Sequence, residues 1–155
     1  MAKVALAVDV GATKVALALV DRAYAISNKQ ELLIGTSSSQ ELWSAISSCA
    51  NEMIAGLNGN LIGVGIGSAG PLHLEQGAIS PVNIPIWRNF PIVEKFKALS
   101  ANNNVILHGD AMALAHAEHV LGAGRGAANM LGMVVSTGVG GGLILDNKVF
   151  TGDSG

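Results

Sequence analysis

Two glycine-containing segments of this chain hold residue types that could bind phosphate. The first is Asp9-Val10-Gly11-Ala12-Thr13-Lys14, between two apolar runs. A tight glycine turn can point successive backbone N–H groups at an anion. Thr13 adds a hydroxyl, Lys14 adds a charge, and Asp9 could hold Mg²⁺ directly or through water. The alternative is a plain hairpin turn, where Asp and Gly are favoured in any case.

The second segment is Ser136-Thr137-Gly138-Val139-Gly140-Gly141-Gly142, again between apolar runs. Its alternative is a flexible turn, but so many glycines lose much backbone entropy on folding. Two such turns on two strand pairs could hold a polyphosphate from both sides. Together the two segments favour phosphate binding over two plain turns.

A third segment, Gly65-Ile66-Gly67-Ser68-Ala69-Gly70, matches the spacing of the dinucleotide-binding fingerprint. That fingerprint requires a helix to begin at the turn, so that the pyrophosphate lies at the helix N-terminus. Pro71 follows instead, so we expect a glycine loop that allows close backbone approach rather than an NAD site. A Walker loop is excluded, because Gly-Lys-Ser/Thr does not occur in the chain.

The elements that position these segments follow from hydrophobic periodicity. Apolar runs predict a hairpin of strands at 3–8 and 14–20, and a weaker strand near 32–35. Ser38 and Glu41 have the spacing of a capping box, and the apolar residues that follow recur at helical spacing, which predicts a helix over 39–56 with Cys49 in its core face. The remaining predictions are strands at 61–66, 105–107, 130–135 and 143–145, a proline-broken loop over 71–91, and helices over 94–99 and 110–121.

Composition narrows the class of protein. Of the 155 residues, 50% are hydrophobic and 13% charged, which excludes intrinsic disorder. The 9 basic and 11 acidic residues are scattered, so we expect no nucleic-acid partner. A single cysteine excludes a disulfide framework and indicates a reducing compartment. Without a signal peptide or a membrane-spanning apolar stretch, we expect a cytoplasmic α/β protein with no membrane partner.

Residues 3–20 and 130–146 share one layout, an apolar strand, a polar glycine turn and a second apolar strand. Repetition of a supersecondary unit indicates a duplicated architecture. A duplicated fold needs a second half of similar size, so we expect the chain to be part of a protein about twice as long.

The motifs taken together resemble, in order and along nearly the whole chain, the ROK family of sugar kinases and sugar-responsive repressors. Five segments carry this resemblance: Asp9 to Lys14 as a first phosphate motif; Gly65 to Pro71 as a sugar-side loop; Pro81-Val82-Asn83-Ile84 with Trp87; Gly109-Asp110-Ala111 through Glu118 and Gly122-Ala123-Gly124; and Ser136 to Gly142 as a second phosphate motif. Ala12 replaces a usual glycine, and Ala69 replaces a proline.

The resemblance implies a ribonuclease-H-like lobe of the actin/hexokinase ATPase type, with a mixed sheet flanked by helices. We expect this lobe over residues 1–121 and the start of a second lobe, with the second phosphate hairpin, over 122–155. The rest of the second lobe would be absent, together with the family's cysteine-rich structural zinc motif. The resemblance also implies a homodimer at full length.

The implied activity is ATP-dependent phosphorylation of a hexose or hexosamine hydroxyl, with ATP and Mg²⁺ as cofactors and a small sugar as substrate. Asp110 would be the catalytic base, and Asp9 would hold Mg²⁺. The other implied site residues are Gly11, Ala12, Thr13, Lys14, Thr137 and Gly138 on the phosphates, and Gly70, Asn83 and Asp110 on the sugar. From the residues alone, without the resemblance, Asp110 is better explained as an N-cap for the helix that follows it, and the two roles are compatible.

Two departures keep other functions open. Gly109 stands where the family usually has a sugar-binding Asn, and His108 stands where a Glu is common. The alternatives are a sugar-sensing repressor domain and a degenerate, non-catalytic sugar- or nucleotide-binding protein. The repressors carry a helix-turn-helix before the first phosphate motif, and Met1 lies only eight residues before Asp9, which favours the kinase.

We expect the 155-residue chain alone to be inactive, because catalysis needs two closing lobes. His116 and His119 share a helix and are expected to be solvated or packed rather than metal ligands.

Overall fold

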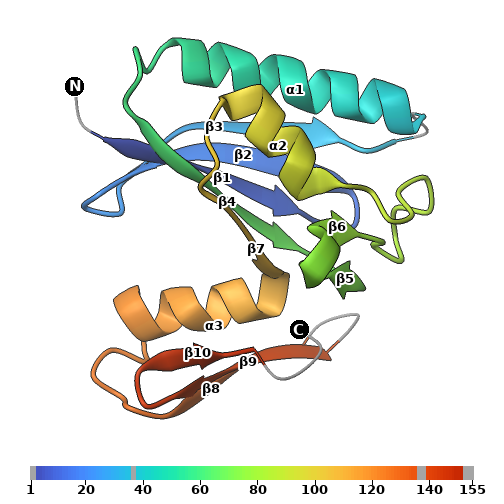
Figure 1. The fold of residues 1–155 in the computed structure, drawn as a ribbon. Helices are drawn as coiled ribbons and strands as arrows, with labels where there is room; N and C mark the ends of the chain where they lie inside the picture. Colours follow the sequence, from blue (N-terminus) through green and yellow to red (C-terminus); the bar gives the residue numbers. More distant parts are fainter. Residues whose placement is uncertain (1–2, 36–37, 136–138, 152–155) are drawn as a thin grey trace. The chain divides into compact units, whose positions relative to one another are not determined.

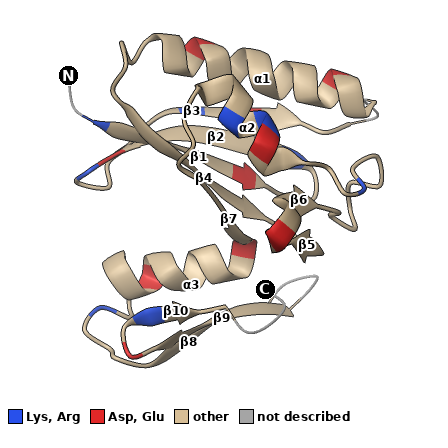
Figure 2. Cartoon of the chain, viewed as in Figure 1, with Lys and Arg blue, Asp and Glu red and all other residues tan. Residues whose placement is uncertain are grey.

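The computed structural model describes residues 3–35, 38–135 and 139–151. The chain forms two compact units, Met1–Leu107 and His108–Gly155. None of the helices in the described ranges is both long and apolar enough to cross a membrane. The basic residues are spread over separate elements rather than gathered on one (Figure 2).

The first unit is built on a five-stranded mixed sheet with the order β3-β2-β1-β4-β7 (Figure 1). Its strands are β1 (Val4–Val10), β2 (Lys14–Asp21), β3 (Ile26–Leu33), β4 (Leu61–Ser68) and β7 (Val105–Gly109), the last of which continues into the second unit. Strand β1 is antiparallel to β2 and parallel to β4. The predicted hairpin of the first two strands is confirmed.

Helices α1 (Ser39–Ala55) and α2 (Ile92–Ser100) pack on one face of this sheet. Alternate residues of the central strands point into the core beneath them, as period-2 patterning requires. The other face of the same strands carries mainly alanine and glycine, with Asp9 near the end of β1. The core residues on the sheet are Leu6, Val8, Val10, Val15, Leu17, Val64 and Ile66, and those on the helices include Leu42, Ile46 and Phe96.

Helix α1 begins where the sequence predicts. Ser38 Oγ accepts a hydrogen bond from the Glu41 amide at 3.2 Å, and the Glu41 carboxylate accepts one from the Ser38 amide at 2.8 Å. This capping box satisfies two donors that the first turn leaves without intrahelical partners. The helix ends at Ala55, before Gly56.

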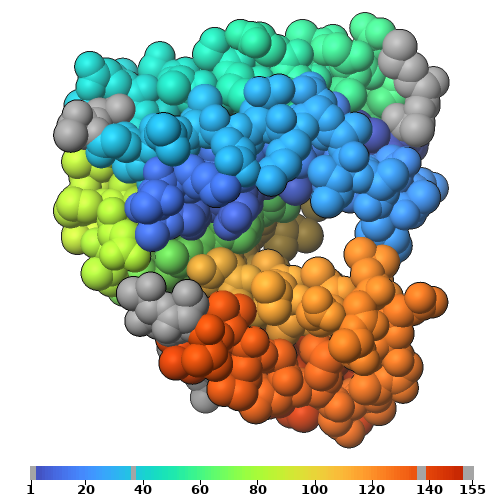
Figure 3. Space-filling view, turned by 180° about the vertical axis from the view of Figure 1, so that it is seen from behind, coloured from blue at the N-terminus to red at the C-terminus, as the bar shows by residue number. Residues whose placement is uncertain are grey.

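The predicted third strand is misplaced. Strand β3 spans Ile26–Leu33, earlier than the expected 32–35, and it is an edge strand exposed along nearly its whole length (Figure 3). Its polar composition gave no apolar signal, because neither face is buried. The loop expected over 71–91 also contains short elements: β5 (Leu72–His73), a 3-10 turn (Leu74–Gln76) and β6 (Ala78–Ile79). Helix α2 begins two residues before the predicted helix.

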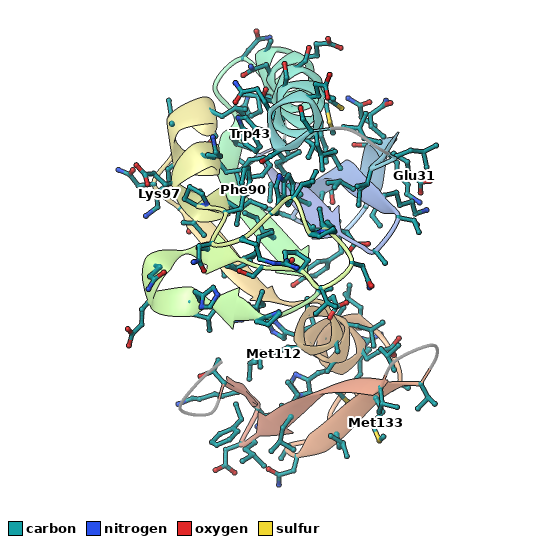
Figure 4. All side chains as sticks on the ribbon, turned by 90° about the vertical axis from the view of Figure 1, so that its right-hand side faces the viewer. Glu31, Trp43, Phe90, Lys97, Met112 and Met133 are labelled. Atoms are coloured by element: carbon teal, nitrogen blue, oxygen red, sulfur yellow. The ribbon has the colours of Figure 1, made fainter. Side chains whose placement is uncertain are left out.

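The second unit consists of α3 (Asp110–Leu121) and a three-stranded antiparallel sheet with the order β10-β9-β8. Its strands are β8 (Met130–Val135), β9 (Val139–Leu145) and β10 (Lys148–Phe150). Helix α3 packs on one sheet face, and Met133 points away from it on the other (Figure 4). The domain boundary expected after residue 121 falls at the end of α3, inside this unit, and stays a prediction for the protein at its native length.

Candidate functional site

The carboxyl ends of the neighbouring parallel strands β1 and β4 lie side by side at one end of the first sheet. Val10 pairs with Ser68, and the Ala69 amide donates to the Val10 carbonyl at 3.3 Å. The turn after β1 and the loop after β4 therefore begin side by side. In α/β sheets the ends of parallel strands form the usual ligand crevice.

The first glycine turn closes tightly. The Gly11 amide donates to the Lys14 carbonyl at 3.0 Å, and a Cβ on Gly11 would lie 3.2 Å from that oxygen. The Thr13 carbonyl accepts from the Ile34 amide at 3.0 Å, which ties the turn to the end of β3. The Thr13 side chain is exposed. This geometry fits both a hairpin turn and an anion site, so phosphate binding there stays a prediction.

Lys14 has a partner that the sequence did not indicate. Its ammonium lies 2.8 Å from the Glu31 carboxylate, and Lys29 lies 2.9 Å from the same oxygen. Hydrogen bonds first from Lys14 and then from Lys29 lower the pKa of Glu31 to about 2. In this conformation the Lys14 charge is directed to the edge strand β3.

Asp9 is exposed on the sheet face opposite the core. Its cross-strand neighbours are Ala16 on β2 and Gly67 on β4, both small. The carboxylate is therefore flanked by little side-chain bulk. An exposed oxygen ligand with small neighbours suits a hydrated Mg²⁺, which keeps several of its waters.

The two predicted sugar-side segments come together in the structure. The Gly70 carbonyl accepts from the Val82 amide at 3.2 Å, and the Pro71 carbonyl accepts from the Ser80 amide at 2.9 Å. Asn83 follows directly and is exposed. The segment expected to be a glycine loop is strand up to Ser68, so that expectation is wrong for Gly65 to Ser68. Strand β5 follows it, so the helix that a dinucleotide fingerprint requires does not begin at this segment.

Aromatic packing anchors the loop that carries Asn83. Trp87 is fully buried and stacks on Phe90 with ring centroids 4.2 Å apart and planes at 6°. Phe90 in turn lies 5.8 Å from the Trp43 ring of α1, and these two side chains face each other in Figure 4. Arg88 also donates to the Pro81 carbonyl at 3.1 Å. The loop is thereby fixed to the helical layer.

Asp110 is the first residue of α3, and Gly109 holds the N-cap position without a side-chain cap bond. The N-cap alternative for Asp110 is therefore wrong. Its Oδ1 accepts instead from the adjacent Ala111 amide at 2.7 Å. A carboxylate in the first turn is favoured by the helix dipole. The side chain is exposed at the helix N-terminus.

His108 precedes this helix. Its Nδ1 is buried and has no hydrogen-bond partner among the described residues. Burial, and secondarily the nearby His116, lowers the pKa of His108, so the neutral imidazole is favoured. His119 Nε2 lies 3.0 Å from the Ala127 carbonyl, and the described ranges hold no group of three or more potential metal ligands.

Glu118 has a structural role that the sequence did not predict. Its carboxylate accepts from the Ala123 amide at 2.9 Å, and its backbone carbonyl accepts from Gly122 and Gly124, each at 3.0 Å. Glu118 therefore holds the loop that follows α3. The only signal was its place in the helix motif before two closely spaced glycines.

The second glycine segment differs from the expected turn. Thr137 and Gly138 lie outside the described residues, and Val135 pairs with Val139 on either side of them. Gly140, Gly141 and Gly142 belong to β9, which is longer than the predicted strand at 143–145. These three glycines are therefore strand residues, not residues of the expected turn.

The structure thus gathers the predicted site residues in two groups. In the first unit, the ends of β1 and β4 bring together the turn after Asp9 and the loop segments of Gly70 and Asn83. In the second unit, Asp110 stands at the N-terminus of α3, which packs on the β8–β9 hairpin.

A family model described as the ROK family matches residues 5–155. The chain is 33% identical to a glucokinase of Halalkalibacterium halodurans over 96% of its own length and 46% of that protein. It is also 33% identical to an N-acetylmannosamine kinase of Salmonella typhimurium, over 97% of the chain and 50% of that protein. The chain spans about half the length of the curated relatives it matches.

Solved structures show the same similarity. A ROK hexokinase from Thermus thermophilus superposes with a TM-score of 0.85 at 32% identity, over 98% of this chain and 50% of that one. A ROK glucokinase from Streptomyces griseus, solved with glucose and AMPPNP, gives 0.78 at 30% identity, over 96% and 46%. A ROK transcriptional regulator at 18% identity and a TM-score of 0.85, over 98% and 39%, shares the fold.

Proposed function

The chain belongs to the ROK family, and from this membership we propose that it supplies part of the active site of an ATP-dependent hexose or hexosamine kinase. The expected actin/hexokinase-type fold is confirmed by the structural neighbours. The observation that carries the proposal is the meeting of the β1 turn and the β4 loop, through the bond between Ala69 and Val10, at one sheet edge. A phosphate-binding turn and a sugar-binding loop must lie this close for phosphoryl transfer.

Asp110 is the proposed catalytic base. Its Oδ1 is engaged by the Ala111 amide, which orients the carboxylate and leaves Oδ2 to accept the proton of the sugar hydroxyl. The hydroxyl oxygen then attacks the γ-phosphorus of ATP in line, and ADP leaves. Phosphoryl transfer depends chiefly on positioning and charge stabilisation, so a fixed carboxylate is the main requirement of this residue.

The phosphates are proposed to lie on Gly11, Ala12 and Thr13 in the first turn and on Thr137 and Gly138 in the second. Asp9 would hold Mg²⁺, directly or through water, and the ion would neutralise phosphate charge. Lys14 joins this set only if its ammonium exchanges Glu31 for a phosphate oxygen, because the two side chains are paired at 2.8 Å.

The sugar is proposed to contact Gly70, Asn83 and Asp110. The hydrogen bond between the Val82 amide and the Gly70 carbonyl holds the first two segments together. Gly109 has no side chain at the position where the family usually has an Asn. A site that recognises sugar hydroxyls by hydrogen bonds is weakened by the loss of each one. This residue is the observation that favours the second candidate, a sugar sensor or non-catalytic sugar-binding protein.

The test is sugar-dependent ADP release by the protein that carries this sequence at its native length. The panel is glucose, fructose, mannose, allose, N-acetylglucosamine and N-acetylmannosamine. Asp110→Asn is the matched variant, because the amide oxygen still accepts from Ala111 while the basic carboxylate is lost. We expect release with one sugar and a fall of about 10²- to 10⁴-fold in the variant.

Absence of release with every sugar, in protein that unfolds cooperatively, would refute the kinase. Sugar binding by calorimetry would then support the second candidate, a sugar sensor or non-catalytic sugar-binding protein. A Gly109→Asn variant that acquires activity would identify this position as the cause. The isolated 155-residue chain is proposed to be inactive, and turnover by it would contradict the two-lobe requirement. A homodimer and a cytoplasmic location are also proposed, and light scattering tests the former.

A further inference from the structure

Two alternate glycines of β9, Gly140 and Gly142, face helix α3. A Cβ on Gly140 would lie 2.8 Å from the Ala111 Cβ, and apart from its chain neighbours no other heavy atom of the described residues lies within 4 Å of it. A Cβ on Gly142 would lie 2.7 Å from the Ala115 Cβ and 2.8 Å from the Met112 Cα. Contacts this short do not occur between real side chains, so α3 packs at a separation that these glycines make possible.

The same seam continues on β8. Gly132 pairs with Gly142, and a Cβ on Gly132 would lie 2.6 Å from the Ala115 Cβ. Ala111 and Ala115 are four residues apart and so lie on one helix face. A seam of glycine against alanine sets both the height and the rotation of α3 over the hairpin, because no flexible side chain intervenes.

Gly140 is coupled to Asp110 through a single residue. The Cβ of Ala111 faces Gly140, and the amide of Ala111 donates to Asp110 Oδ1 at 2.7 Å. A methyl group added at Gly140 would press on Ala111 and move the donor that orients the carboxylate. The added bulk acts at the first turn of α3, where Asp110 stands.

We propose that Gly140 is a positioning residue for Asp110, acting through Ala111, and that its contribution to the reaction is the close approach of α3 rather than phosphate contact. This proposal rests on the proposed kinase function for its kinetic consequence only. The packing consequence stands without it. If Gly140 instead served a phosphate site, its backbone would have to contact the phosphates of the nucleotide.

The test exchanges one methyl group between the two sides of the seam. Gly140→Ala introduces the clash, and Gly140→Ala with Ala111→Gly removes the atom of α3 that the new Cβ would meet. Ala111→Gly alone gives the baseline. The matched control is Gly140→Ala with Ala117→Gly, which has the same composition but alters an exposed residue of α3.

Measured well below the unfolding midpoint, Gly140→Ala is expected to lower kcat by 10-fold or more, on the order of what small misplacements produce. The KM values for ATP and sugar should stay within about twofold. The Ala111→Gly exchange should restore kcat to the baseline and raise the lowered midpoint, and the Ala117→Gly control should restore neither. A rise in KM for ATP without rescue would overturn the proposal in favour of phosphate contact. A lowered midpoint with unchanged kcat would also overturn it.

A second readout does not need activity. In two-dimensional NMR spectra, Gly140→Ala should shift the amide resonance of Ala111. The amide resonance of Ala117, the exposed control residue of α3, should stay in place. The Asp110→Asn spectrum identifies the signal of the bonded amide. If wild-type protein phosphorylates no sugar, the kinase proposal fails while this shift still decides whether Gly140 orients Asp110. An unmoved Ala111 signal would overturn the inference.

Discussion

Replacing Trp87 with alanine should release the loop that carries Asn83 from the first unit. The indole ring is fully buried and stacked on Phe90 at 4.2 Å. Truncation of a buried large aromatic residue destabilises proteins by about 3–5 kcal/mol. Loss of the ring pair adds about 0.5–1.5 kcal/mol. We therefore expect a decrease of about 4 kcal/mol in the free energy of unfolding.

Trp87→Phe is the matched control. Phenylalanine keeps a ring to stack on Phe90, and the indole Nε1 that it loses has no hydrogen-bond partner among the described residues. A smaller aromatic side chain leaves some space but removes a buried donor without a partner, so we expect a loss of about 1 kcal/mol. The difference of about 3 kcal/mol between the variants measures the stacking and burial of the ring.

The assay is urea unfolding followed by far-UV circular dichroism, with the dependence on urea compared between variants. If Gly70 and Asn83 contact the sugar as proposed, sugar affinity in Trp87→Ala should weaken more than ATP affinity, because the anchored loop carries both residues. A loss below about 1 kcal/mol in Trp87→Ala, or equal losses in both variants, would refute the reasoning.

Three further predictions concern the first unit. Ser38→Ala should lower the unfolding free energy by about 1 kcal/mol, measured by urea unfolding, because both capping-box bonds with Glu41 are formed; no change would exclude the cap as a stabilising feature. The pKa of Glu31 is lowered from its ordinary 4.5 to about 2, so its ion pairs stabilise the fold above about pH 4.5, and this stabilisation is lost as pH falls through 2. Glu31→Gln should therefore be less stable than wild type at pH 7, with the gap closing in acid, and a gap independent of pH would contradict the ion pair. Burial, and secondarily Glu52, raises the pKa of the Cys49 thiol, so a colorimetric disulfide reagent should react with it more slowly in folded than in urea-unfolded protein at pH 8; equal rates would contradict the burial.

Patterns among neighbours along the chain determined much of this protein. The Ser38–Glu41 spacing and the apolar period that follows placed α1 to within one residue at its end. Alternating and continuous apolar runs located β1, β2 and β8, since each has one face that is less exposed than the other. The order of five motifs indicated the family that the comparisons show.

Partners from distant segments were not predictable from these patterns. Strand β3 lies earlier than the predicted 32–35 because an exposed edge strand has no apolar period, and its Glu31 is the partner of Lys14. The two groups of candidate site residues, too, are assembled by the register of β1 with β4 and by the packing of α3, neither of which is a local property.

The glycines of β9 show the distinction most clearly. The sequence by itself determined that this segment must do without side chains, and it suggested a phosphate turn as the reason. Only the tertiary structure decided that Gly140 and Gly142 lie against Ala111 and Ala115 of a helix some thirty residues earlier in the chain. A glycine can be required either for a backbone conformation that other residues avoid or for the close approach of another segment. The sequence does not distinguish these two reasons, because the packing distance depends on which distant segment folds against the strand.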